Sequence, residues 1–198
     1  MMIDYNNISD SISYYEMHGY KRVELPWTVS KDVAVMTMPK DKRISVIKHT
    51  GRVLPGSAEQ CFLHQYMQGR LPLGKFQAVT PCFRDEVVDE LHQKQFMKNE
   101  LIMTDDVSPT TLLIMIADAK EFMANSLGVR HDDLIVVNKS NGIELSYDIE
   151  YRRVDMQTIE LGSYGIRSSN FVNWIYGTGC AEPRMSYVRK QIELEKTL

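Results

Sequence analysis

The sequence lacks the features of membrane and secreted proteins. No apolar run in its 198 residues approaches the roughly 20 residues that a membrane-spanning helix needs. Residues 1–7 have neither the basic start nor the apolar core of a signal peptide. The three cysteines, Cys61, Cys82 and Cys180, are odd in number and far apart, which argues against a disulfide framework. We therefore expect a cytoplasmic protein in a reducing compartment.

An excess of positive charge is also missing. The net charge is −3, so the overall charge does not favour non-specific binding to nucleic acid, although a local basic patch stays open. Internal repeats and low-complexity tracts are absent. The length suits one domain, residues 1–198, with a substantial core.

Hydrophobic periodicity and turn residues predict more strands than helices. Capping signals mark the helices most clearly: Ser57-x-x-Gln60 resembles a capping box, and Ser108-Pro109 precedes a helix that should stop at Gly128. The predicted helices cover 9–18, 57–68, 108–128 and a closing segment after 184. The predicted strands cover 20–27, 33–38, 44–48, 75–83, 134–137, 143–151, 156–161 and 171–176, and the second and third pair as a hairpin turning at 39–42. Short turns between strands favour an α+β fold, an antiparallel β-sheet flanked by helices.

The stretch Phe83–Glu100 predicts two further short strands joined by a polar turn. Arg84 and Glu86 are two residues apart on the first strand, and Phe96, Lys98 and Glu100 repeat with the same period on the second. Side chains two apart on a strand share a face. An arginine, a carboxylate and an aromatic ring on one face suit a nucleotide. A charged surface hairpin is the alternative interpretation.

Three segments, in order, resemble the three signature motifs of class II aminoacyl-tRNA synthetases, most nearly those of seryl-tRNA synthetase. The first is the helix 9–18 followed by Gly19–Pro26; the second is Phe83–Glu86 with His92, Phe96 and Glu100; the third is Gly177–Arg184. Two further stretches are similar to the seryl enzymes, Leu54–Glu59 to a Thr-x-Glu loop with serine for threonine, and 147–150 with 160–163 to paired strands. The resemblance covers nearly the whole chain. It implies a catalytic domain that activates an amino acid with ATP.

The resemblance assigns a nucleotide role to four residues. Arg84 would hold the α-phosphate of ATP and then the adenylate. Phe96 would stack on adenine, and Glu86 would contact the adenine amine and ribose side. Arg184 would clamp the γ-phosphate or cover adenine from the other face. A structural ion pair between Arg184 and Glu160 is the alternative.

The resemblance also assigns a metal and a substrate. Glu160 and Ser163 match the positions that hold catalytic Mg²⁺ in seryl enzymes, with oxygen ligands for a hard cation. Ser57 and Glu59, in the loop Leu54–Glu59, would contact the substrate; Glu59 would bind its ammonium, unless it is only a helix-start carboxylate. Thr178, six residues before Arg184, matches a threonine that contacts the serine hydroxyl. A small amino acid is therefore implied.

Zinc is an alternative implied by some relatives of the seryl enzymes. The archaeal type and the amino acid:carrier-protein ligases bind zinc through two cysteines and a glutamate, and Cys61, Glu100 and Cys180 come from comparable regions. Three such ligands would leave one zinc position for an amino group. However, Cys180 lies nearer to Arg184 than that pattern leads one to expect, and buried thiols are common.

The sequence departs from the tRNA-charging relatives in the segments that would bind the acyl acceptor. The loop Val87–Leu91 is short and carries no basic residue, whereas the loop of tRNA-charging relatives is longer. No segment resembles the helical tRNA-binding arm or an anticodon domain. We therefore expect an acceptor other than a conventional tRNA: a carrier protein, a small metabolite or a modified nucleic acid. The alternatives are a minimal tRNA ligase that needs a partner, and a non-catalytic module that senses ATP or an amino acid. The first motif implies a homodimer.

Overall fold

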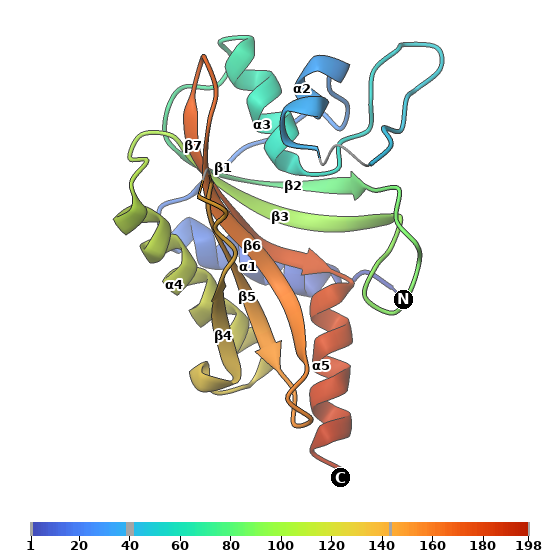
Figure 1. The fold of residues 1–198 in the computed structure, drawn as a ribbon, viewed down its shortest axis with the longest axis vertical. Helices are drawn as coiled ribbons and strands as arrows, with labels where there is room; N and C mark the ends of the chain where they lie inside the picture. The colour runs from blue at the N-terminus through green and yellow to red at the C-terminus, as the bar shows by residue number, and fades with distance from the viewer. Residues whose placement is uncertain (1, 39–41, 143, 198) are drawn as a thin grey trace.

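A single mixed sheet organises the computed structural model, which describes residues 2–38, 42–142 and 144–197. Seven strands of these residues lie in the order β1-β2-β3-β7-β6-β5-β4 (Figure 1). Their bounds are β1 Lys21–Arg22, β2 Lys75–Phe83, β3 Gln95–Met103, β4 Leu134–Asn138, β5 Leu145–Arg152, β6 Thr158–Ser168 and β7 Asn173–Glu182. Every neighbouring pair is antiparallel except β1 and β2, at one edge. The predicted α+β fold is confirmed.

Helices cover both faces of the sheet. They are α1 Tyr5–Met17, α2 Lys31–Thr37, α3 Ala58–Met67, α4 Pro109–Leu127 and α5 Arg184–Glu195. On β3, Asn99 donates to Ser11 of α1, whereas the next residue, Glu100, accepts from Ser57 at the start of α3. Because successive strand residues point to opposite faces, α1 and α3 lie on opposite sides. In Figure 1, α4 lies to the left of β4 and β5, α5 lies to the right of β6, α1 crosses behind the strands, and α2 and α3 lie above β2.

Two apolar cores follow from this arrangement. The larger core joins the sheet to α1, α4 and α5, with fully buried Tyr15, Met115 and Tyr164 among its members. The smaller core lies beneath α2 and α3 and includes Phe62 and Trp174. No helix in the described part of the chain is long and apolar enough to cross a membrane.

The predicted helix 108–128 is confirmed by its capping groups. Ser108 Oγ accepts from Thr111 N at 3.2 Å, Pro109 occupies the first turn, and Gly128 adopts φ 65° just after the last residue. A left-handed C-terminal position favours glycine, which has no Cβ to clash. Local chemistry therefore determines both ends of α4.

The predicted helix 57–68 is also confirmed, with a different reciprocal contact. Ser57 Oγ accepts from Glu59 N at 3.1 Å, as an N-cap should. Gln60 Oε1 accepts from Gly56 N at 2.9 Å, not from Ser57 N as in a capping box. The capping signal located the helix correctly, but neither bond is that of a capping box, in which Ser57 Oγ would accept from Gln60 N.

The predicted hairpin 33–38/44–48 is wrong. Residues 31–37 form α2, and 44–48 contribute a single bridge, Val46 to Val53; of the predicted turn, 39–41 lie outside the described residues. Val33 and Ala34 are adjacent and both buried, which a helix lying on α3 allows, and Gln60 Nε2 donates to Ala34 O at 2.9 Å. A seven-residue segment is too short for its periodicity to separate the two structures.

Several other predicted strand boundaries differ from those in the structure. The predicted strand 20–27 pairs only over β1, and the predicted start of β5, Ile143, lies outside the described residues. β6 and β7 run farther than predicted, so residues 177–182 of the third motif are strand. The structure therefore presents this motif as a sheet strand that leads directly into α5.

Candidate functional site

One cavity collects the predicted site residues. It has a volume of about 330 Å³ and lies between α2, the start of α3, the loop after β2, and β3, β6 and β7. Of the predicted residues it is lined by Ser57, Glu59, Arg84, Glu86, Phe96, Glu100, Glu160, Ser163, Thr178 and Arg184. Cys61 and Cys180 are not part of its lining. The volume is in the range of small-molecule sites, about 300–1,000 Å³.

Arg84 and Phe96 form one end of the cavity. β2 stops one residue before Arg84, so Arg84 and Glu86 lie in a loop and not on the predicted strand. Arg84 N still donates to Lys94 O at 2.9 Å, and its Nε donates to Gly56 O at 3.1 Å. The guanidinium carbon lies 5.1 Å from the centre of the Phe96 ring. The arginine and the ring are therefore held together, as a phosphate and base site would require.

Arg184 and Glu160 form the ion pair that the sequence left as an alternative. Arg184 is the first residue of α5, and its Nη1 lies 3.1 Å from Glu160 Oε1. The Glu160 side chain is 47% exposed. Exposed pairs contribute little to stability because water screens them. Both side chains can therefore exchange this contact for a ligand in the cavity.

A β-bulge places Glu160 and Ser163 on one face. Side chains three residues apart on a regular strand point to opposite faces. The register between β5 and β6 shifts at Ile149/Glu150, so that Asp148 lies opposite Ser163 and Glu150 lies opposite Glu160. Ser163 Oγ donates to Asp148 Oδ1 at 2.5 Å. The extra residue therefore brings both predicted Mg²⁺ ligands to the cavity wall.

This donor set fits Mg²⁺. A carboxylate and a hydroxyl are hard oxygen donors, and protein-bound Mg²⁺ takes its remaining ligands from phosphates and water. Within the described ranges, no three His, Cys, Asp or Glu side chains are placed to hold a metal by themselves. The nucleotide would therefore have to complete the coordination.

The three residues of the zinc hypothesis are not brought together. β7 has an extra residue at Gly179: Glu100 lies opposite Thr178, and Asn99 lies opposite Cys180. Thr178 therefore shares the cavity face with Glu100, whereas Cys180 shares the other face with Asn99 and is buried in the larger core. Cys61 is buried in the smaller core. The residues present do not fit a zinc site.

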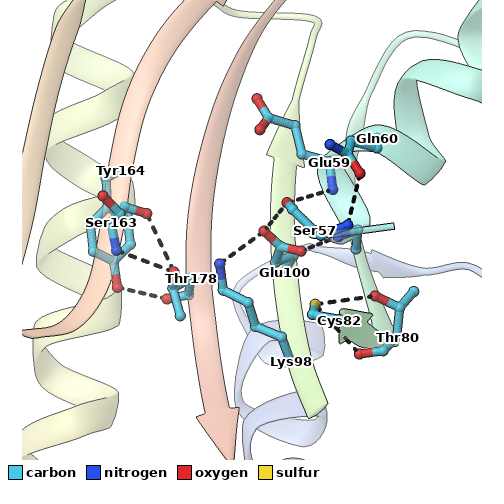
Figure 2. Close-up of polar contacts among 12 residues, drawn as sticks. Ser57, Glu59, Gln60, Thr80, Cys82, Lys98, Glu100, Ser163, Tyr164 and Thr178 are labelled. Atoms are coloured by element: carbon cyan, nitrogen blue, oxygen red, sulfur yellow. Dashed lines mark hydrogen bonds and ion pairs between the residues drawn. The ribbon is translucent and has the colours of Figure 1, made fainter. Parts of the chain in front are cut away.

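Glu100 is the centre of a buried polar network instead. It accepts from Ser57 Oγ at 2.6 Å, from Lys98 Nζ at 2.9 Å and from Ala58 N (Figure 2). Burial alone would raise the pKa of Glu100, but Lys98 and the hydrogen bonds outweigh it and hold the pKa below its usual value. The Lys98 side chain is 11% exposed and supplies the counter-charge of this network.

Thr178 is fixed to the neighbouring strand. Its Oγ1 accepts from Ser163 N at 3.2 Å and lies 3.4 Å from Ser163 O (Figure 2). A Cβ on Gly162 would lie 2.7 Å from the Thr178 Cβ, closer than atoms can approach. The same Cβ would meet Tyr164 and Met123 of the larger core, so β6 and β7 are in close contact on the core side of Gly162.

Sequence reasoning missed Arg167, which pairs with Glu59. Glu59 Oε2 accepts from Arg167 Nη1 at 2.7 Å, and its Oε1 accepts from Trp174 Nε1 at 2.6 Å. Burial raises the pKa of Glu59, and these two partners act against the rise. Arg167 is on β6, four residues after Ser163. That even spacing on a strand was the signal that could have placed it on the same face.

No protein-family model and no curated protein matches the sequence. Solved structures do match. The chain aligns over 91% of its length with the cytoplasmic serine-tRNA ligase of Naegleria fowleri in complex with AMP, at 19% identity and a TM-score of 0.73. It aligns over 93% with the pyrrolysyl-tRNA synthetase of Desulfitobacterium hafniense (15% identity, TM-score 0.70), and over 92% with the seryl-tRNA synthetase of Pyrococcus horikoshii complexed with ATP (17%, 0.65).

These likenesses establish the fold. The chain has the fold of class II aminoacyl-tRNA synthetase catalytic cores, as the motifs predicted. It spans 47% and 48% of the two seryl enzymes and 68% of the pyrrolysyl enzyme. Fold by itself does not specify a reaction, so function has to be argued from the cavity.

Proposed function

We propose that this chain activates a small, serine-like amino acid with ATP, forming an aminoacyl-adenylate and pyrophosphate. One observation carries the proposal: Arg84, Phe96, Glu160 and Arg184, from four separate segments, line the same cavity of about 330 Å³. The neighbouring structures with AMP and with ATP support a nucleotide as the ligand.

In the proposed reaction, an oxygen of the amino-acid carboxylate attacks the α-phosphorus of ATP. A new C–O–P linkage forms, the bond from the α-phosphorus to the bridging oxygen breaks, and pyrophosphate leaves. The attacking carboxylate is already ionised at neutral pH, so no general base is required. Negative charge grows on the phosphate oxygens, and Arg84 and Arg184 would stabilise it. Phe96 would orient the base by stacking.

Mg²⁺ would be held by Glu160 and Ser163. When bound, it would supply charge neutralisation for the phosphates. Asp148 would keep the Ser163 hydroxyl oriented, since Ser163 Oγ donates to it and leaves its lone pairs toward the cavity. Arg184 would leave Glu160 for a phosphate.

A small substrate follows from the inner walls. Thr178 Oγ1 accepts from Ser163 N, which holds the Thr178 side chain on the cavity wall. Ser57 and Glu100 close the same end through their hydrogen bond. The Thr178 hydroxyl would contact a short, serine-like side chain at this wall of the cavity.

The acyl acceptor is proposed to be something other than a conventional tRNA. The loop Val87–Leu91 beside the cavity carries Asp89 and Glu90 and no basic residue, and Val87 is 88% exposed. Asp89 folds the loop back by accepting from His92 N and Leu91 N. An acidic loop repels a phosphate backbone. A carrier protein, a small metabolite or a modified nucleic acid would be the acceptor.

The test is ATP–pyrophosphate exchange with each of the twenty amino acids. Exchange is expected with a small amino acid, and Arg84→Ala should reduce it by at least about a hundredfold because the developing charge loses its bidentate donor. Arg130→Ala, at an exposed ion pair, is the control and should leave exchange unchanged. No exchange with any amino acid, together with no ATP binding by calorimetry, would overturn the proposal.

A further inference from the structure

Arg167 occupies a site built for an organic cation. Its Nε donates to Glu144 Oε1 at 2.6 Å and its Nη1 donates to Glu59 Oε2 at 2.7 Å. The guanidinium carbon lies 4.2 Å from the centre of the Tyr176 ring, whose hydroxyl also donates to Glu144. Two carboxylates and an aromatic face are the groups by which proteins bind guanidinium and ammonium ligands. We call Glu59, Glu144 and Tyr176 the cation cage.

The cation cage opens into the proposed substrate cavity. Glu59, Tyr176 and Arg167 itself line that cavity, and the Arg167 side chain is 28% exposed. Its Nη2 has no hydrogen-bond partner among the residues that the structure describes. In Figure 2 the carboxylate of Glu59 points away from Glu100, so the two carboxylates face different parts of the cavity.

The charges of the cage decide what it can accept. Glu59 and Glu144 together carry two negative charges, and Arg167 supplies one positive charge. With Arg167 in place, one negative charge remains, which suits a single substrate ammonium. Without it, two unpaired carboxylates would face the cavity, and burial makes that state unfavourable unless a cation enters.

We propose that Arg167 is a specificity-determining residue, which fills from within the chain the place that the side-chain cation of a basic amino acid would take. The proposal rests on the proposed amino-acid activation and specifies its substrate class: small and neutral, with lysine, ornithine and 2,3-diaminopropionate excluded. Arg167 therefore excludes the side chains of these basic amino acids by occupying the cation cage.

Measurements of cation binding test the cation cage without requiring catalysis. Arg167→Ala is titrated with methylguanidinium and with 2,3-diaminopropionate in a calorimeter, and its melting temperature is recorded with each. Affinity for both cations should exceed that of the wild type by about tenfold or more, as expected for a desolvated cation–π and ion-pair site. Arg130→Ala, which removes an exposed and ion-paired arginine, should gain nothing.

A second variant keeps the proposal testable if Arg167→Ala does not fold. Arg167→Gln is neutral and can still donate to Glu59, so it should fold and bind the same cations. If Arg167→Ala unfolds, methylguanidinium added during refolding should restore it. Failure of the folded variants to bind cations better than the wild type, or failure of the added cation to restore an unfolded Arg167→Ala, would overturn the proposal.

Exchange activity separates this inference from the proposed function. In Arg167→Ala the ratio of exchange with 2,3-diaminopropionate to exchange with the preferred neutral amino acid should rise about tenfold or more relative to the wild type. If the variants bind cations but no form of the protein catalyses exchange, the cation-cage proposal is supported and the proposed amino-acid activation is refuted. Exchange by the wild type, with no gain in cation affinity in the Arg167 variants, would overturn the cation-cage proposal and leave amino-acid activation supported.

Discussion

At the scale of single residues, the polar groups of the cavity already hold one another in position. Glu100 receives donors from three groups, Glu59 receives donors from two, and Ser163 is tied to Asp148. Such satisfied networks fix side-chain geometry, and removing one member leaves its buried partner without compensation.

Glu100 should therefore make stability depend on pH. Its folded-state pKa is depressed, so its contribution is present above the unfolded value of about 4.3 and is lost as pH falls through the lower folded value. At pH 7, Glu100→Gln should cost about 3 kcal/mol, since it leaves Lys98 unpaired. The cost should shrink as pH falls below about 4.

Urea denaturation of both proteins between pH 7 and pH 3 measures this difference. Glu193→Gln, at an exposed position of α5, is the matched control and should show no such trend. A Glu100→Gln cost that stays constant across the whole range would contradict the depressed pKa.

At the scale of elements, two β-bulges and the N-cap of α3 determine which side chains reach the cavity. The bulge at Gly179 turns Thr178 toward the cavity and Cys180 toward the larger core, and the shift at Ile149/Glu150 places Glu160 and Ser163 on one face. Ser57 caps α3 and also holds Glu100, so the helix start and the site share one hydroxyl.

The N-caps of α3 and α4, Ser57 and Ser108, should differ in how much they contribute to the free energy of unfolding. Ser108 Oγ accepts from Thr111 N and contacts the Thr111 hydroxyl, so Ser108→Ala should cost about 1 kcal/mol. Ser57→Ala should cost more, about 2–3 kcal/mol, because Glu100 also loses a donor where it is buried. Thermal or urea unfolding of both variants measures the difference. Equal costs would show that the contact from Ser57 to Glu100 is not a stabilising one.

At the scale of the whole molecule, the sheet separates two cores, and the cavity lies on the side of the smaller core. The helices α1, α4 and α5 pack on the opposite face and leave the cavity face to α2 and α3 (Figure 1). Apolar side chains in and next to the first-motif region are exposed on the molecular surface. Met17 at the end of α1 is 79% exposed, and Trp27 after β1 is 57% exposed.

We expect these exposed apolar side chains to be covered in a homodimer, as the first motif implies. Sedimentation equilibrium should give twice the chain mass of 22.9 kDa. Met17→Glu should shift the equilibrium toward the monomer, because it places a charge in an apolar contact. Val87→Glu, in the exposed loop beside the cavity, is the control. A monomer at every concentration would refute the expectation.

The sequence by itself determined the elements whose signals are local. Ser108, Pro109 and Gly128 mark the ends of α4, and the strand predicted at Lys75–Phe83 has those bounds in the structure. The three motifs also predicted the fold, through their resemblance, in order, to those of class II aminoacyl-tRNA synthetases. The roles of the matched site residues remain proposals that exchange kinetics will test.

Tertiary structure decided what depends on neighbours distant in the sequence. The segment 31–37 is a helix because it lies against α3, and Cys180 leaves the cavity face because β7 gains a residue opposite β3. Arg167 enters the site only because Glu59 and Glu144, 108 and 23 residues away along the chain, meet beside it. A strand shifted by one residue turns its following side chains to the other face, and no local pattern records where that shift occurs.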